Sequence, residues 1–300
     1  MEPRIRVRAF AKINVGLKIL GKRADGYHEI RTVFQTVALH DLLTVTISKR
    51  GRGITLVCDE PSIPTGSDNL VYRACGAWKQ ASGFHGGIRI ELIKKIPAGA
   101  GLGGASSDAA ATLLALERLT GDQLEAAERT RIAAELGSDV PFFLFGGRAL
   151  ASGRGEEIVP LDDLPRRCCL IVFPGFQVST AWAYGEAGRL PGRRLTKGRR
   201  ALKMDVLGAR PLFPLREWGP AENDFERVVF ARWPELAKLK RQLIRAGAET
   251  ASLTGSGSAV FALFQSAQKT AQASELVPRG WQCFHSRTLS GAEYRRRLTQ

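Results

Sequence analysis

The first half of the chain contains short segments in which apolar residues run together or alternate with polar ones. A two-residue period of this kind puts one face of a β-strand against a core. The run 21–26, rich in turn-forming residues, follows the second of these segments. The segments predicted to be strands are residues 5–11, 14–20, 43–48, 54–58 and 87–92.

Other segments show the helical period instead. In residues 69–81, Leu70, Ala74 and Ala77 recur at helical spacing. Residues 106–119 are rich in alanine and end before Gly121, which is typical of a helix with a glycine stop. A second helix is predicted at 122–136, and a third is predicted to begin near residue 138.

The character of the chain changes after residue 160. A short buried strand is predicted at 170–173, a Pro/Gly/Arg-rich stretch runs from 185 to 220, a helix is predicted at 234–246 and a strand at 258–264. We therefore predict two domains, residues 1–160 and 161–300. Strands and helices that do not strictly alternate indicate the α+β class rather than a doubly wound sheet.

The composition of the chain excludes several classes of protein. The chain is 44% hydrophobic and 24% charged, and it has neither an apolar run long enough to cross a bilayer nor an apolar signal segment near Met1. We expect a cytoplasmic protein without a membrane partner. The five cysteines form no CxxC pair, so we expect neither a zinc site nor a disulfide.

The net charge of +15 suits either nucleic acid or a small polyanionic substrate. Much of it lies at 189–200 and 295–297, where solvated segments are the ordinary interpretation. Charge by itself does not identify the partner.

A glycine-rich run at 97–108 carries the chemistry. Four glycines in six residues allow the backbone to approach a ligand closely, and the run leads directly into a helix whose free N–H groups attract an anion. We predict a phosphate-binding loop made of Pro97, Ala98, Gly99, Ala100, Gly101, Leu102, Gly103, Gly104, Ala105, Ser106 and Ser107.

Two better-known phosphate loops do not fit this run. The dinucleotide fingerprint requires a strand after the helix, but a second helix is predicted there. A Walker loop requires Lys and Ser or Thr directly after its last glycine, but Ala105 and Ser106 follow Gly104. The run therefore fits a kinase that binds phosphate with a different glycine loop. The alternative is that the glycines serve tight packing only.

Several motifs, in the same order along the chain, resemble those of the galacto/homoserine/mevalonate/phosphomevalonate kinase superfamily. They are residues 11–17, 97–108 and 253–261, and residues 22–29 and 136–143 also match one branch of this superfamily. The resemblance implies an N-terminal domain like the second domain of ribosomal protein S5 and a ferredoxin-like C-terminal domain, with the active site between them. It also implies ATP with Mg²⁺ as co-substrate, with no bound metal or organic cofactor.

The resemblance implies two catalytic residues. Lys12 would contact the transferring phosphate, and Asp139 would be the base for the acceptor hydroxyl. From the residues by themselves, a helix cap is the favoured role for Asp139 and a solvated strand end is open for Lys12. Asn14 would orient the acceptor, with a satisfied buried amide as the alternative, and Ser107 could contact Mg²⁺.

Residues 25–29 (DGYHE) resemble the branch of the superfamily whose acceptor carries cytidine diphosphate, in the non-mevalonate route to isoprenoid precursors. By this resemblance the rings of Tyr27 and Tyr184 sandwich the cytosine, and His28 reads the edge of the base. Ordinary surface aromatics are the alternative. Two other functions stay open: a sister kinase for homoserine, mevalonate or a sugar, and a basic RNA-binding module, although we expect no nucleic-acid partner.

Overall fold

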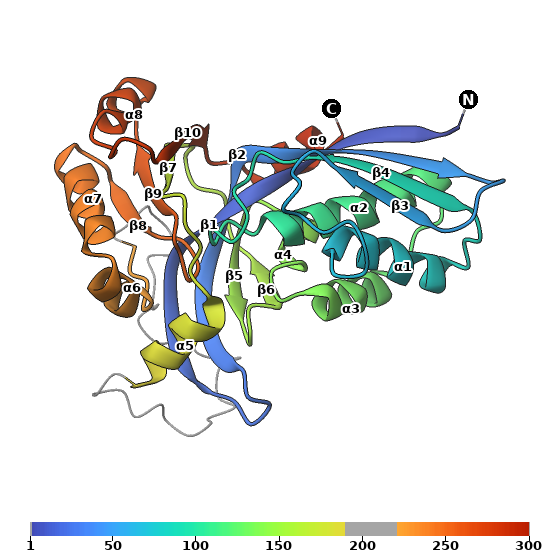
Figure 1. The fold of residues 1–300 in the computed structure, drawn as a ribbon, viewed down its shortest axis with the longest axis horizontal. Helices are drawn as coiled ribbons and strands as arrows, with labels where there is room; N and C mark the ends of the chain where they lie inside the picture. Colours follow the sequence, from blue (N-terminus) through green and yellow to red (C-terminus); the bar gives the residue numbers. More distant parts are fainter. Residues whose placement is uncertain (1, 190–220, 300) are drawn as a thin grey trace.

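The computed structural model describes residues 2–189 and 221–299, which form two lobes (Figure 1). No helix within these residues is long and apolar enough to cross a membrane. In chain order the elements are β1 (Arg4–Lys22), β2 (His28–Ser48), β3 (Ile54–Cys58), α1 (Leu70–Ser82), β4 (Gly87–Ile93), α2 (Gly104–Thr120), α3 (Ala126–Leu136), α4 (Phe142–Phe145), β5 (Arg148–Ser152), β6 (Glu157–Pro160), β7 (Cys168–Phe173), α5 (Thr180–Arg189), α6 (Glu226–Arg232), α7 (Pro234–Arg245), β8 (Thr250–Leu253), β9 (Val260–Phe264), α8 (Ala267–Ser274), β10 (Gln282–Arg287) and α9 (Gly291–Arg297). The predicted α+β class is confirmed.

The first lobe is built on a long antiparallel hairpin of β1 and β2. The segments 5–11 and 14–20 are parts of one strand, so their separation into two strands was wrong. A shift of register between Phe10 and Lys12 marks a β-bulge, which interrupts the regular alternation that the sequence pattern depends on. Most of β2 before residue 43 was not predicted.

The hairpin belongs to a mixed sheet with helices on one face. Within the described residues the strand order is β3-β4-β2-β5-β6, with β1 paired to β2. Helices α1, α2 and α3 lie below this sheet (Figure 1). Large side chains such as Phe10, Phe34, Trp78 and Phe142 are fully buried between the two layers. This apolar layer holds the start of α2 in place, and the glycine loop precedes it.

Helix α3 begins later than the sequence predicts. Gly121 has a left-handed φ of 79° and ends α2. The Leu124 N–H then donates to Glu117 Oε1 at 3.1 Å, a bond that replaces a helical one. The predicted helix at 122–136 is therefore shorter and starts at Ala126.

The second lobe has the ferredoxin-like arrangement that the resemblance implies. Within the described residues its sheet has the order β10-β7-β9-β8, and every neighbouring pair is antiparallel. Helices α5 to α7 lie between β7 and β8 in the chain, and α8 lies between β9 and β10. Of the stretch 185–220, residues 185–189 complete α5, whereas 190–220 lie outside the described residues.

The two lobes share parts of the chain. Leu17, Ile19 and Ile30, from the far end of the hairpin, belong to the apolar core of the second lobe. Conversely, Tyr294 of α9 is buried in the first lobe, where its hydroxyl donates to the Phe143 carbonyl at 2.5 Å. Residue 160 thus separates the two sheets but not the two cores.

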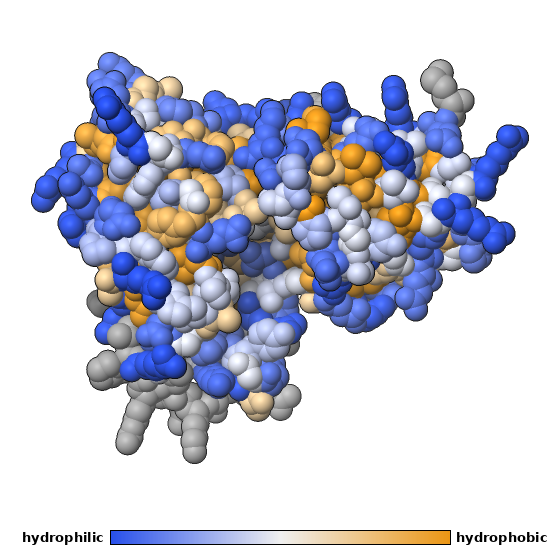
Figure 2. All heavy atoms as spheres, in the orientation of Figure 1, coloured by the Kyte–Doolittle hydropathy of each residue, from blue (hydrophilic) through white to orange (hydrophobic). Residues whose placement is uncertain are grey.

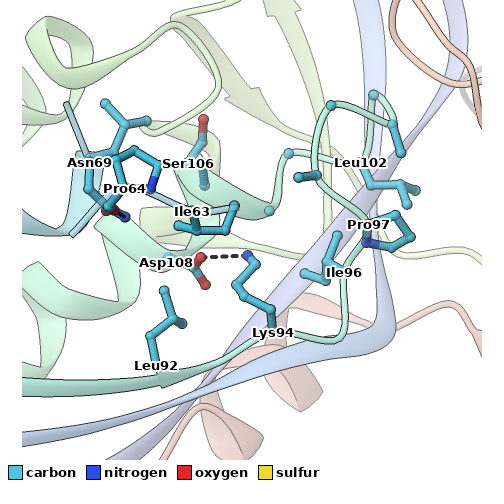
Figure 3. A pocket seen from close by; sticks show the side chains of 18 of the residues that line it. Ile63, Pro64, Asn69, Leu92, Lys94, Ile96, Pro97, Leu102, Ser106 and Asp108 are labelled. Atoms are coloured by element: carbon cyan, nitrogen blue, oxygen red, sulfur yellow. Dashed lines mark hydrogen bonds and ion pairs between the residues drawn. The ribbon is translucent and has the colours of Figure 1, made fainter. Parts of the chain in front are cut away.

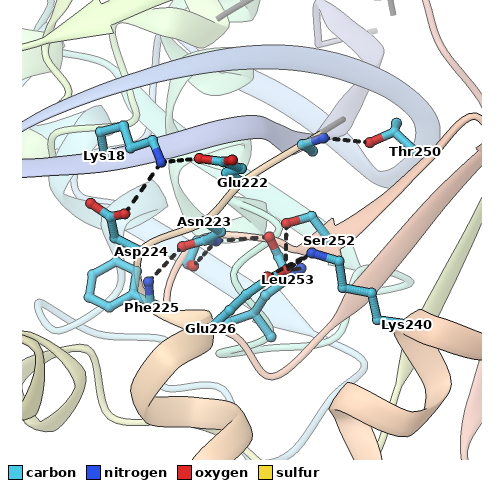
Figure 4. A network of polar contacts seen from close by, with 12 residues as sticks. Lys18, Glu222, Asn223, Asp224, Phe225, Glu226, Lys240, Thr250, Ser252 and Leu253 are labelled. Carbon is cyan, nitrogen blue, oxygen red and sulfur yellow. Dashed lines mark hydrogen bonds and ion pairs between the residues drawn. The ribbon is translucent and has the colours of Figure 1, made fainter. Parts of the chain in front are cut away.

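A polar network strengthens this connection (Figure 4). Lys18 of β1 forms ion pairs with Glu222 and, at 3.6 Å, with Asp224. The neighbouring Asn223 donates through Nδ2 to the Gly255 carbonyl at 2.8 Å. The hairpin, the segment before α6 and the glycine turn after β8 are therefore held as one unit at the junction of the lobes.

Candidate active site

The glycine loop lies at the junction of the lobes, where the surface is hollowed (Figure 2). Gly99, Gly101 and Gly103 have φ values of 65°, 81° and 72°, which side chains with a Cβ rarely adopt. Gly103 is the N-cap of α2 and supplies no side-chain cap, so the first N–H groups of α2 are available to an anion. A cavity of about 300 Å³ follows the loop.

The loop is also held by the rest of the protein. The Lys12 amide donates to the Leu102 carbonyl at 2.9 Å, and the Ala259 amide donates to the Ala100 carbonyl at 3.2 Å. A Cβ at Gly101 would lie 2.1 Å from the Thr254 carbonyl oxygen. Gly101 is therefore required by contact with the second lobe, whatever the loop binds.

Lys12 and Asp139 lie together beside the loop. Lys12 Nζ is 3.3 Å from Asp139 Oδ2, and the two side chains are 4% and 30% exposed. The ammonium group also lies 4.9 Å from the centre of the Phe34 ring. The favoured role from sequence for Asp139, a cap, finds no support, because α4 begins after Pro141 and has no side-chain cap.

The side chain of Asn14 is buried, and both ends of its amide group form hydrogen bonds. Its Oδ1 accepts from Lys12 Nζ at 2.7 Å and from the Gly255 amide at 2.8 Å. Its Nδ2 donates to Thr32 Oγ1 at 2.8 Å. The structure thus places Asn14 between Lys12 and the glycine turn of the second lobe, where it orients Lys12, and contact with an acceptor stays a prediction.

The three residues assigned to cytosine lie near the far end of the hairpin, but not as a sandwich. The rings of His28 and Tyr184 are stacked, with centroids 4.6 Å apart and planes 10° from parallel. Tyr27 is 55% exposed, and the Arg154 guanidinium lies 4.8 Å from its ring centre. A base between Tyr27 and Tyr184 therefore requires the His28 ring to leave the face of Tyr184.

The ionisation of this group is shaped by burial. Burial is the larger cause that lowers the pKa of His28, and the positive charge of Lys22 is the smaller one. His28 is therefore neutral at pH 7, with one nitrogen donating and one accepting. Burial also raises the pKa of Tyr184, and the negative charge of Asp139 raises it further to a smaller extent.

The cavity beside the loop contains residues that the sequence did not reveal. Its far wall is apolar, and Figure 3 shows Ile63, Pro64 and Leu92 around the space next to the loop. The residues of this wall come from the loop before α1 and the first residue of α1, and from β4 and the segment directly after it, so only their convergence in space marks them. They are Ile63, Pro64, Leu70, Leu92 and Ile96, with the amide of Asn69 beside them.

The residues present suit Mg²⁺ that arrives with a phosphate ligand. Ser107 is buried in the first turn of α2, and its Oγ has no hydrogen-bond partner within residues 2–189 and 221–299. A hydroxyl oxygen is a suitable ligand for Mg²⁺, which usually takes few protein oxygens and completes its shell with phosphates and water. Among the described residues no group of three His, Cys, Asp or Glu side chains could hold a metal ion.

Comparison with known proteins identifies the family of the chain. A curated relative from Solibacter usitatus (strain Ellin6076), 4-diphosphocytidyl-2-C-methyl-D-erythritol kinase, is 44% identical over 271 residues, 90% of this chain and 84% of the relative. The chain belongs to this kinase family. A relative of the same name from Prosthecochloris aestuarii (strain DSM 271 / SK 413) is 41% identical over 90% of this chain and 93% of its own length.

Family models and solved structures agree with this assignment. Residues 69–147 match the N-terminal domain of GHMP kinases, and residues 214–282 match the C-terminal one. A crystal structure of 4-(cytidine 5'-diphospho)-2C-methyl-D-erythritol kinase has a TM-score of 0.75 at 34% identity, covering 94% of this chain and 98% of that one. Homoserine kinase from Cytophaga hutchinsonii ATCC 33406, at 20% identity and a TM-score of 0.65 over 97% of each chain, shares the fold. The chain is an ATP-dependent small-molecule kinase, and the superfamily resemblance is confirmed.

Proposed function

We propose that this kinase transfers the γ-phosphoryl group of ATP to the 2-hydroxyl of 4-diphosphocytidyl-2-C-methyl-D-erythritol. The observation that carries the proposal is the convergence of three sites at one junction. These are the glycine loop with its cavity, the Lys12–Asp139 pair at 3.3 Å, and the stacked His28–Tyr184 rings. A donor, a reaction centre and a flat base would each have a place there.

ATP would lie along the loop. Its phosphates would accept hydrogen bonds from the loop amides and from the first N–H groups of α2, whose dipole attracts negative charge. The adenine would enter the apolar end of the cavity between Ile63, Leu70 and Leu92, with the Asn69 amide able to contact its polar edge. Mg²⁺, held by Ser107 and the phosphates, would neutralise part of the phosphate charge when bound.

Transfer needs a base for the hydroxyl proton and a cation for the moving charge. Asp139 is half-buried, so its carboxylate can reach an acceptor in the hollow, whereas Lys12 is held beneath it by Asn14. In this arrangement Asp139 accepts the proton as the hydroxyl oxygen attacks the γ-phosphorus of ATP, and the bond from that phosphorus to the bridging oxygen breaks so that ADP leaves. Lys12 stabilises the developing negative charge, and it cannot move away because its stem is buried.

The cytidine diphosphate part would occupy the aromatic end of the hollow. The base would take the place that the His28 ring now has on Tyr184, and Tyr27, which is exposed, would cover its other face. His28 would then turn to the edge of the base. A neutral imidazole offers both a donor and an acceptor, as cytosine recognition requires.

A coupled ADP-release assay tests the proposal. Purified protein with ATP and Mg²⁺ is supplied separately with the cytidylated methylerythritol, homoserine, mevalonate and galactose. We expect turnover with the first acceptor at a kcat/KM at least about a hundredfold above the others, because a missing base forfeits stacking of about 1–3 kcal/mol and its edge contacts. Equal or greater turnover with any of the other three would refute the assignment of the acceptor.

A further inference from the structure

A buried group of three charged residues lies beside the cavity, and the mechanism above does not use it. Lys94 Nζ is 2.5 Å from Asp41 Oδ2 and 2.8 Å from Asp108 Oδ2. The Lys94, Asp41 and Asp108 side chains are 9%, 0% and 3% exposed. Lys94 and Asp108 line the cavity, and Figure 3 shows the bond between them within its wall.

These residues connect the two ends of the phosphate loop. Asp41 Oδ1 accepts the amides of Lys95 at 2.5 Å and Ile96 at 2.8 Å, the last residues before the loop begins. Asp108 is in the first turns of α2, directly after the loop. The Lys94 ammonium therefore joins a carboxylate that holds the start of the loop to a carboxylate on the helix at its end.

Stability does not explain this group. Burying charges costs several kcal/mol per ion, and apolar residues of similar size often give an equally stable protein. The arrangement is also incomplete by itself: Asp108 Oδ1 is buried, and among the described residues it has no hydrogen-bond partner. Two carboxylates against one ammonium leave one negative charge in excess if both are ionised. A group of this cost beside a ligand site indicates a role in the site.

We propose that Lys94, Asp41 and Asp108 are positioning residues that hold the phosphate loop open at the width ATP requires. The inference rests on the proposed placement of ATP along this loop. Without the bridge, the start of the loop and the first turn of α2 move independently. Their N–H groups then no longer point at the same phosphates, so the affinity for ATP falls while the acceptor site is unaffected.

The decisive measurement is the dissociation constant for Mg-ATP, obtained by calorimetry without an acceptor. In Lys94→Met we expect it to rise at least about tenfold, with the KM of the acceptor within about twofold of the wild-type value. The matched control is Arg129→Met, which breaks an ion pair with Glu117 of 2.8 Å at the other end of α2 and should leave ATP affinity unchanged.

A second variant keeps the proposal testable if Lys94→Met fails to fold. Asp108→Ala removes the partner of Lys94 on α2, which lies 2.8 Å from its ammonium group, and should raise the dissociation constant for Mg-ATP about threefold to tenfold. A purely structural role would lower the melting temperature but leave the ATP affinity of the folded variants unchanged.

The outcomes separate this inference from the proposed function. Wild-type protein that binds no ATP overturns the proposed function itself. Wild-type protein that binds ATP, with folded Lys94→Met or folded Asp108→Ala binding it equally well, overturns the positioning role and leaves the kinase assignment standing.

Discussion

Replacing Asp139 by Asn changes one atom at the centre of the proposed mechanism. The amide keeps the shape of the carboxylate and can still accept a hydrogen bond from Lys12 Nζ, now 3.3 Å from Oδ2. It cannot take the proton of the acceptor hydroxyl. Removing a general base costs a factor of about 10² to 10⁴ in turnover, or about 3 to 5 kcal/mol in the barrier.

The same substitution should affect little else. The Asp139 side chain is 30% exposed, so its ion pair with Lys12 contributes at most about 1 kcal/mol to folding. Lys12 also keeps its bond of 2.7 Å to Asn14 Oδ1. We therefore expect kcat to fall by at least about a hundredfold, while the melting temperature changes by only about 2–4 °C.

Steady-state kcat, calorimetric ATP binding and a thermal melt of Asp139→Asn together test this reasoning. ATP affinity should stay within about threefold of the wild-type value, because the loop amides are untouched. A folded variant that retains a third of the wild-type turnover would show that Asp139 is not the base. A loss of ATP affinity in parallel with kcat would instead place Asp139 in the nucleotide site.

Three further predictions follow from the site. Gly101→Ala places a methyl group 2.1 Å from the Thr254 carbonyl oxygen, at a backbone φ of 81°. The thermal melt should therefore show a destabilisation of about 1–3 kcal/mol. A melting curve like that of the wild type would contradict the contact. Tyr27→Ala should raise the KM of the acceptor about tenfold to a hundredfold through lost stacking, with the KM of ATP unchanged as the control. Because the pKa of His28 lies below its usual 6.5, the neutral form dominates at pH 7. The KM of the acceptor should therefore be constant above pH 7 and rise in acid as the ring is protonated. The variant His28→Ala should lack this rise.

Local patterns in the sequence were sufficient to predict a glycine loop that leads into a helix, whereas phosphate binding by that loop stays a prediction. The glycine spacing and the helix after it depend on backbone conformation within about ten residues, which a single segment determines. The α+β class followed for the same reason, because the period of each segment reports which of its faces is buried. The motif at 25–29 indicated the family through a resemblance, and the relatives confirmed it.

Tertiary structure decided how those parts meet. No pattern along the chain relates Asp41 to Lys94 and Asp108, since the three are separated by strands and a loop and meet only when the sheet forms. The apolar cavity wall was hidden for the same reason, and the sequence could not show that His28 rather than Tyr27 contacts Tyr184. Periodicity along the chain encodes which face of each element is buried. The distances between side chains of different elements depend instead on how the elements pack, and a site consists of side chains held at such distances.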